Sequence, residues 1–77
     1  MNSAITDAVI KIEAAGNIVV VNTFSGMANA IAVCCDALSH DLIVGSVAGD
    51  DTIIIIARSA EAADDLNSRI KEIIRGQ

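Results

Sequence analysis

This chain of 77 residues is predicted to fold as one α+β domain with two layers, a four-stranded, mainly antiparallel sheet and two helices on one of its faces. Three observations predict this fold. Four short aliphatic runs are bounded by turn residues, each pair of runs is followed by a longer segment with helical periodicity, and the chain is long enough for only one small core. The expected order of elements over residues 1–77 is therefore ββαββα.

The first two strands are expected at residues 7–13 and 18–23. Alternation along the first strand places three apolar side chains on one face: Ala8, Ile10 and Ile12. The residues between the strands predict a turn, because Gly16 and Asn17 both tolerate a positive φ. The pair should form a hairpin.

A helix is expected from Gly26 to about Leu38, opened by Ser25, because small and branched apolar residues dominate this segment. Its apolar residues run almost all the way round the helix. A helix of that kind in a protein dissolved in water is buried on more than one side. We therefore expect a second subunit to cover part of it.

The second pair of strands is expected at residues 42–47 and 52–57, joined by a turn at 48–51. Ser59 should cap the last helix, and Gly76 should follow its C-terminal end. The apolar stripe of this helix comprises Ala62, Ala63, Leu66, Ile70, Ile73 and Ile74.

Composition and charge argue against several classes of function. Ten acidic and five basic residues leave a formal net charge of −5, which opposes nucleic-acid binding by this chain alone. The uncharged span from Ala14 to Cys35 contains glycines and asparagines and changes its period midway, so a membrane helix is not expected. The first residues lack the basic and apolar regions of a signal peptide. The adjacent Cys34 and Cys35 should not form an intrachain disulfide, which fits a reducing cytoplasm.

Four polar side chains stand out against this aliphatic background. Asp50 and Asp51 form a pair at the turn between two strands, where a carboxylate kept from water needs a cationic or hydrogen-bonding partner. Asn29 and Asp36 interrupt the first helix, and seven residues at about 100° each bring them onto one stripe. The four groups offer mostly acceptors and one amide donor, which suits a ligand with several N–H groups and one carboxylate.

Other interpretations of these residues stay open at this stage. Asn29 and Asp36 could be hydrated or hydrogen-bonded positions, and Asp50 and Asp51 could form an ordinary acidic turn. A divalent metal on the three aspartates would need more oxygen ligands than this turn supplies. We therefore expect no metal at these residues.

Zinc binding and nucleophilic catalysis are the remaining alternatives. A zinc site could be formed by Cys34, Cys35 and His40. The two cysteines are adjacent in the sequence, however, and this does not match the ligand spacing of structural zinc sites. His40 could serve Ser39 or Cys35 as a base, but nothing in the sequence orients it.

Two segments resemble the C-terminal domain of bacterial arginine repressors. Residues 45–53, GSVAGDDTI, resemble that family's G-T-[IV]-x-G-D-D-T-[IL] motif, and residues 23–29, TFSGMAN, resemble its T-x-P-G-x-A-x motif. Asp36 follows at the spacing that the family uses, and the resemblance covers residues 8–74. Ser25 departs from the frequent Pro, and Asn29 replaces the Gln of several members with an amide that is one methylene shorter.

The resemblance implies an L-arginine sensor that assembles as two stacked trimers and binds L-arginine where the trimers meet. The implied ligand contacts come from Asn29, Asp36, Asp50, Asp51 and the backbone of Ala48. One aspartate of the pair would reach a ligand held mainly by the opposite trimer. L-arginine would be the corepressor, without a further cofactor, and DNA would be bound only through an N-terminal winged-helix domain that this chain lacks.

Three functional hypotheses follow. The first is a non-enzymatic, cytoplasmic L-arginine-binding and oligomerisation domain of a transcriptional repressor of arginine metabolism. The second is a purely structural trimerisation module whose acidic turn is solvated. The third is a small enzyme of the same architecture that uses His40 as an acid or base.

Overall fold

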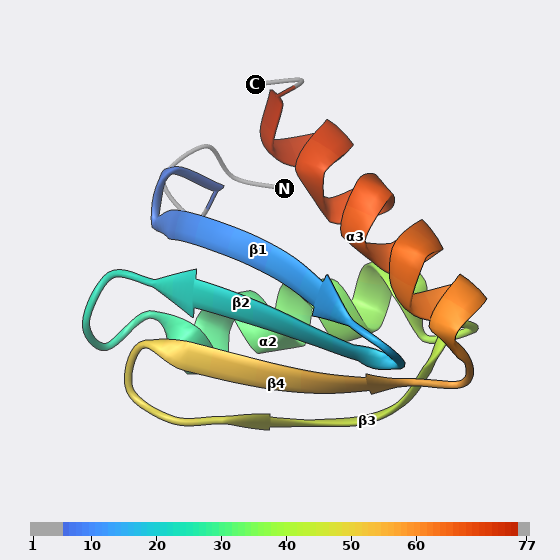
Figure 1. The fold of residues 1–77 in the computed structure, drawn as a ribbon. Coiled ribbons are helices and arrows are strands. Elements are labelled where there is room, and N and C mark those ends of the chain that lie inside the picture. Colours follow the sequence, from blue (N-terminus) through green and yellow to red (C-terminus); the bar gives the residue numbers. More distant parts are fainter. Residues whose placement is uncertain (1–5, 76–77) are drawn as a thin grey trace.

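The computed structural model describes residues 6–75 and confirms the predicted two-layer α+β fold (Figure 1). The strands pair antiparallel in the order β1-β2-β4-β3. The elements are β1 (Val9–Ala15), β2 (Ile18–Thr23), α2 (Ala28–Ser39), β3 (Ile43–Ala48), β4 (Thr52–Ala57) and α3 (Ala60–Arg75). Within residues 6–75, no helix is long and apolar enough to cross a membrane.

The β1–β2 hairpin is tighter than the sequence predicts. Ala15 pairs with Ile18, which leaves Gly16 and Asn17 as a two-residue loop. Gly16 has a φ of 61°, and no residue other than glycine has a positive φ among residues 6–75. A glycine at the first loop position and a negative φ at the second are typical of a type II′ turn, whose twist matches that of the strands. Strand β1 therefore extends through Ala15 instead of ending at Glu13.

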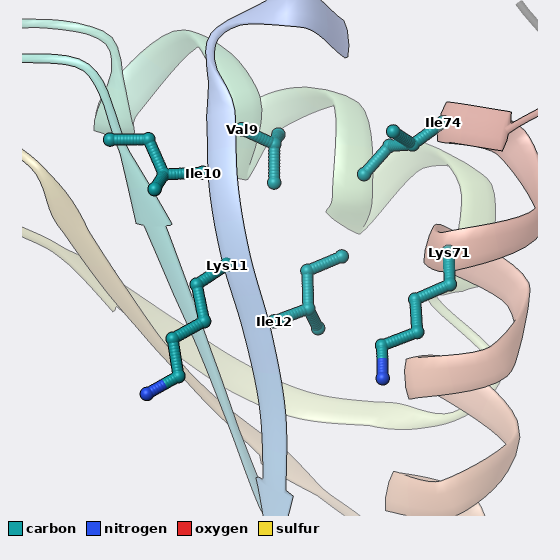
Figure 2. A pocket seen from close by; sticks show the side chains of 6 residues that line it. All are labelled: Val9, Ile10, Lys11, Ile12, Lys71 and Ile74. Atoms are coloured by element: carbon teal, nitrogen blue, oxygen red, sulfur yellow. The ribbon is translucent and has the colours of Figure 1, made fainter.

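A β-bulge in β1 overturns the predicted alternation of this strand. The register with β2 shifts between Val9 and Lys11, so one extra residue is inserted there. Val9 and Ile12 point toward α3, whereas Ile10 points to the other side of the strand and is 63% exposed (Figure 2). The prediction that Ile10 shares the buried face with Ile12 was wrong, because strict alternation does not survive an inserted residue.

The core lies between the inner face of the sheet and the two helices. The central strands β2 and β4 contribute side chains from alternate positions, and α2 and α3 contribute the residues that pack against them. The most deeply buried aliphatic side chains are Val19, Val21, Ile31, Ile53, Ile55 and Leu66. Since no described residue of this core is aromatic, its stability depends on close packing of branched aliphatic groups.

Helix α2 begins later than predicted. The structure starts it at Ala28, and Met27 in the N-cap position makes no side-chain capping bond. Gly26 has a φ of 79°, which is incompatible with a right-handed helix at that residue. The predicted cap Ser25 therefore lies in the preceding turn and is not the N-cap residue of α2.

Helix α3 follows its prediction closely. Ser59 Oγ accepts a hydrogen bond from the Ala62 N–H at 2.9 Å, so the predicted cap is confirmed. The predicted stripe faces the core, with Leu66 fully buried and Ile74 half-buried. On the side of the helix, Arg69 bonds to the Asp41 carboxylate at 3.4 Å. Gly76, the predicted C-cap, lies outside the described residues.

The outer face of the sheet is apolar in its centre. The strand register places Val20, Ile54 and Val47 in one row across β2, β4 and β3 on this face. In the single chain Ile54 is 45% exposed and Val47 is 71% exposed. Neither helix covers these side chains, since both pack on the inner face.

Leu66→Ala tests the core. The substitution should lower the free energy of unfolding by about 2–5 kcal/mol, because it removes buried apolar area and leaves a cavity. Urea unfolding at one fixed protein concentration measures this change. Ser68→Ala, an exposed position on the same helix, should stay within about 0.5 kcal/mol of the parent chain. Equal losses in the two variants would contradict the packing described here.

Candidate ligand-binding site

The β3–β4 turn is fixed against the start of α2 by its backbone. The Asp50 carbonyl accepts hydrogen bonds from the N–H groups of Gly26 at 3.0 Å and Ala28 at 3.3 Å. The Asp51 carbonyl accepts a bond from the Thr23 N–H at 2.7 Å. One of these bonds meets the N–H of Ala28, the first residue of α2, which has no partner inside the helix. The turn and the β2–α2 loop therefore lie side by side at one end of the molecule (Figure 1).

The side chains of Asp50 and Asp51 are exposed in the single chain. Thr52 Oγ1 donates to Asp51 Oδ1 at 3.0 Å and itself accepts a bond from Asn22 Nδ2 at 3.2 Å, which orients the Asp51 carboxylate. The start of α2 favours negative charge here by about 0.3–1 kcal/mol through its dipole. In the single chain both carboxylates are therefore open to water.

No cation within the described chain pairs with this turn. Among the side chains of residues 6–74, the ion pairs join Lys11 to Glu13 at 3.2 Å and Arg69 to Asp41 at 3.4 Å. Both pairs lie on other parts of the molecule. The two adjacent carboxylates thus keep their capacity to accept hydrogen bonds from a positively charged group.

Asp36 is held by a residue that the sequence did not single out. Ser46 Oγ lies 3.2 Å from each oxygen of the Asp36 carboxylate and donates to it. Ser46 pairs with the inward-facing Ile55, so its hydroxyl points toward α2. The alternation of β3 could have placed Ser46 on that face, but only the helix position supplies its partner.

The predicted site residues lie along one edge of the molecule and do not form a single cluster. Asn29 follows Ala28, whose N–H bonds to the Asp50 carbonyl, so Asn29 lies beside the acidic turn. Asp36 lies about 10 Å further along α2, at about 1.5 Å per residue. Ala48 ends β3 and is half-buried, whereas Asn29 and Asp36 are exposed. A ligand that contacts both the turn and Asp36 must therefore be extended.

A small hollow adjoins Asp36 at the C-terminal end of α2. Its volume is about 180 Å³, and it is lined by Asp36, His40, Ile43, Val44 and Gly45. Strand β3 thus forms an apolar wall, while α2 supplies an acceptor in Asp36 and the residue after the helix, His40, supplies an imidazole.

A second groove, between β1 and α3, contains none of the predicted site residues. It has a volume of about 190 Å³, and Val9, Ile12, Ile74 and the Lys71 ammonium group face it (Figure 2). It offers no carboxylate. Its lining residues are four apolar residues and two lysines, Lys11 and Lys71, so this groove does not fit a guanidinium.

The structure also bears on the two alternatives of a metal site and a reactive cysteine. Among residues 6–75, no group of three His, Cys, Asp or Glu side chains is arranged to hold a metal ion. Cys34 and Cys35 are free thiols, and Cys35 is buried. Burial, with the nearby Cys34 and Asp36, raises the pKa of Cys35 from 9.0 to about 12. At neutral pH this thiol stays protonated, so it is not an activated nucleophile for His40.

Comparison with known proteins supports the motif resemblance. The family model described as "Arginine repressor, C-terminal domain" matches residues 5–72. This chain belongs to that family. It is similar to the arginine repressors of Geobacillus sp. strain WCH70, with 40% identity over 96% of the chain and 50% of the relative, and Clostridium acetobutylicum, with 46% identity over 86% and 44%. The arginine repressor of Bacillus subtilis strain 168 is 36% identical over 96% of the chain and 50% of the relative.

The comparisons also bear on the class of function. The chain spans about half the length of the curated relatives it matches. These relatives are named as repressors, which are regulators of transcription and not enzymes. The expectation of a non-enzymatic domain agrees with this family, and the third hypothesis, a small enzyme built on His40, does not.

The raised pKa of Cys35 predicts a loss of stability in alkali. Between pH 9 and pH 12 the folded chain keeps a thiol proton that the unfolded chain releases, so the free energy of unfolding falls as pH rises. The slope from this group is at most about 1.4 kcal/mol per pH unit. Urea unfolding of Cys35→Ala and the parent chain at pH 8, 9 and 10 measures it. Cys34→Ala should keep most of the slope, and an unchanged slope in Cys35→Ala would contradict this account.

Proposed function

We propose that this chain is the L-arginine-binding and oligomerisation domain of a transcriptional repressor of arginine metabolism. L-arginine would act as corepressor at the interface between two trimers, and contact with DNA would come from a separate domain. The observation that carries this proposal is the acidic turn at Asp50 and Asp51, which is fixed against α2 and lacks a cationic partner among the side chains of residues 6–74.

The chemistry of the edge favours a guanidinium ligand. A guanidinium presents N–H donors in a planar fork that matches a carboxylate, and it stays charged at all physiological pH values. Asp50, Asp51 and Asp36 supply only acceptors when ionised. An extended ligand with a guanidinium at one end and an ammonium at the other could reach the turn and Asp36 together.

Two exposed apolar surfaces favour self-association. The first is the outer sheet face, where Val20, Ile54 and Val47 form a row. The second is the outer side of α2, where Val33 is 68% exposed and Leu38 is 45% exposed. Apolar surface that no element of the protomer covers is typical of protein–protein interfaces. The predicted cover of α2 by a second subunit therefore stays part of this proposal.

Binding and assembly would be coupled through charge. Aspartates from facing trimers would repel one another without a ligand, whereas a bound cation would neutralise them. A ligand that binds only the assembled form stabilises it by mass action, by about 2.7 kcal/mol when it is present at one hundred times its dissociation constant. The alternative, a purely structural trimerisation module, has no such coupling.

Substitution of the acidic edge tests ligand binding. In calorimetric titration with L-arginine, Asp36→Asn, Asp50→Asn and Asp51→Asn should each bind about tenfold or more weakly, because each removes a charge-assisted hydrogen bond of about 1.5–3 kcal/mol. Asp65→Asn, an exposed position on α3, removes the same charge elsewhere and should bind like the parent chain. No heat and no thermal shift of the parent chain at millimolar L-arginine would overturn the proposed function.

Sedimentation velocity tests assembly. L-arginine should shift the parent chain toward its largest species, whereas the structural alternative expects the same assembly with and without it. Val47→Lys should reduce the oligomer, because it places a charge in the apolar row of the outer sheet face. Val47 is 71% exposed, so the protomer should remain folded. Ser68→Lys on α3 is the matched control, and equal dissociation of both variants would count against the outer sheet face.

A further inference from the structure

The hollow beside Asp36 has two polar walls, Asp36 in α2 and His40 at its C-cap. His40 follows Asp36 by four residues and keeps helical angles, with φ −58° and ψ −25°. Residues four apart on a helix are neighbours on one face. The Ile43 N–H bonds to the His40 carbonyl at 3.4 Å, which fixes the connector between α2 and β3. Gly45 adds no side chain, so the space between Asp36 and His40 stays open toward β3.

The two walls differ in chemistry. The Asp36 carboxylate is oriented by the Ser46 hydroxyl at 3.2 Å and can accept further bonds. The His40 side chain is exposed and has no hydrogen-bond partner among residues 6–75. An acceptor and a donor that face one small space without bonding to each other fit a zwitterion, such as the ammonium and carboxylate on the α-carbon of an amino acid.

The carboxylate that follows His40 in the chain is already engaged. On the connector, the Asp41 carboxylate accepts a bond from Arg69 of α3 at 3.4 Å. Strand β3 contributes no titratable side chain, since it consists of Ile, Val, Gly, Ser, Val and Ala. Asp36 is therefore the acidic group that shares the hollow with His40.

An amino-acid ligand on the edge that carries Asp36, Asp50 and Asp51 needs a hydrogen-bond donor for its α-carboxylate. Three aspartates attract the cationic groups of a ligand, but they repel its α-carboxylate. Asn29 is the one amide donor predicted for the site, and it lies beside the acidic turn, about two helical turns from Asp36. If the α-ammonium of the ligand is bound to Asp36, the adjacent α-carboxylate cannot reach Asn29.

We propose that His40 donates a hydrogen bond to the α-carboxylate of the amino-acid ligand while Asp36 binds its α-ammonium. His40 is then a specificity-determining residue that favours an amino acid over an amine without a carboxylate. This inference rests on the proposed L-arginine binding.

Calorimetric titration at about pH 6 with two ligands tests the inference. L-arginine carries the α-carboxylate, and L-argininamide replaces it with a neutral amide of nearly the same size. His40→Ala should bind L-arginine about tenfold more weakly, as expected for the loss of one charge-assisted bond, and should bind L-argininamide within about twofold of the parent chain. Asp41→Asn is the control on the connector and should leave the ratio of the two affinities unchanged.

A second readout follows the imidazole itself. The chain contains one histidine, so the imidazole Hε1 signal in NMR reports on His40 alone. L-arginine should raise the pKa measured from this signal, and L-argininamide should not, because only the former brings a negative charge to the ring.

The outcomes separate the two proposals. If His40→Ala weakens both ligands equally, or if L-arginine leaves the imidazole titration unchanged, the role of His40 is overturned while L-arginine binding stands. If the parent chain binds neither ligand, the proposed function fails and this inference fails with it.

Discussion

The backbone contact between the β3–β4 turn and the start of α2 is the constraint on which the rest of the structure depends. The Asp50 carbonyl accepts the N–H groups of Gly26 and Ala28, and so meets the first N–H of a helix that has no side-chain cap. The same contact holds two carboxylates at the positive end of the helix dipole. One set of bonds therefore begins the helix, closes the end of the domain and places the acidic turn beside Asn29.

The protomer buries only part of its aliphatic surface. Hydrophobic residues make up 53% of a chain of 77 residues, and a domain of this size has too little interior to hide them all. The excess lies on the outer sheet face and the outer side of α2, next to the edge that carries Asp36. In the proposed function this arrangement joins assembly to ligand binding, since the surfaces that would associate border the groups that would bind the ligand.

Sequence periodicity predicted most of the fold because most elements obey it. Strand β4 has the predicted ends, and α3 has the predicted cap at Ser59. Two predictions failed where local geometry departs from the regular period. The bulge in β1 placed Ile10 on the face opposite to Ile12. The positive φ of Gly26 made α2 begin after the predicted cap, Ser25. An inserted strand residue and a left-handed glycine both depend on partners from other elements, which a local pattern does not contain.

The amino-acid sequence by itself determined the order of elements, the family and the surplus of carboxylates, because spacing and composition are local properties of the chain. Only the tertiary structure decided how those carboxylates are held and what lies beside them. Ser46 meets Asp36 because β3 packs next to α2, and His40 shares a hollow with Asp36 because Gly45 of that strand leaves the space open. Contacts between residues distant in sequence arise from packing, and packing is set by the whole core at once.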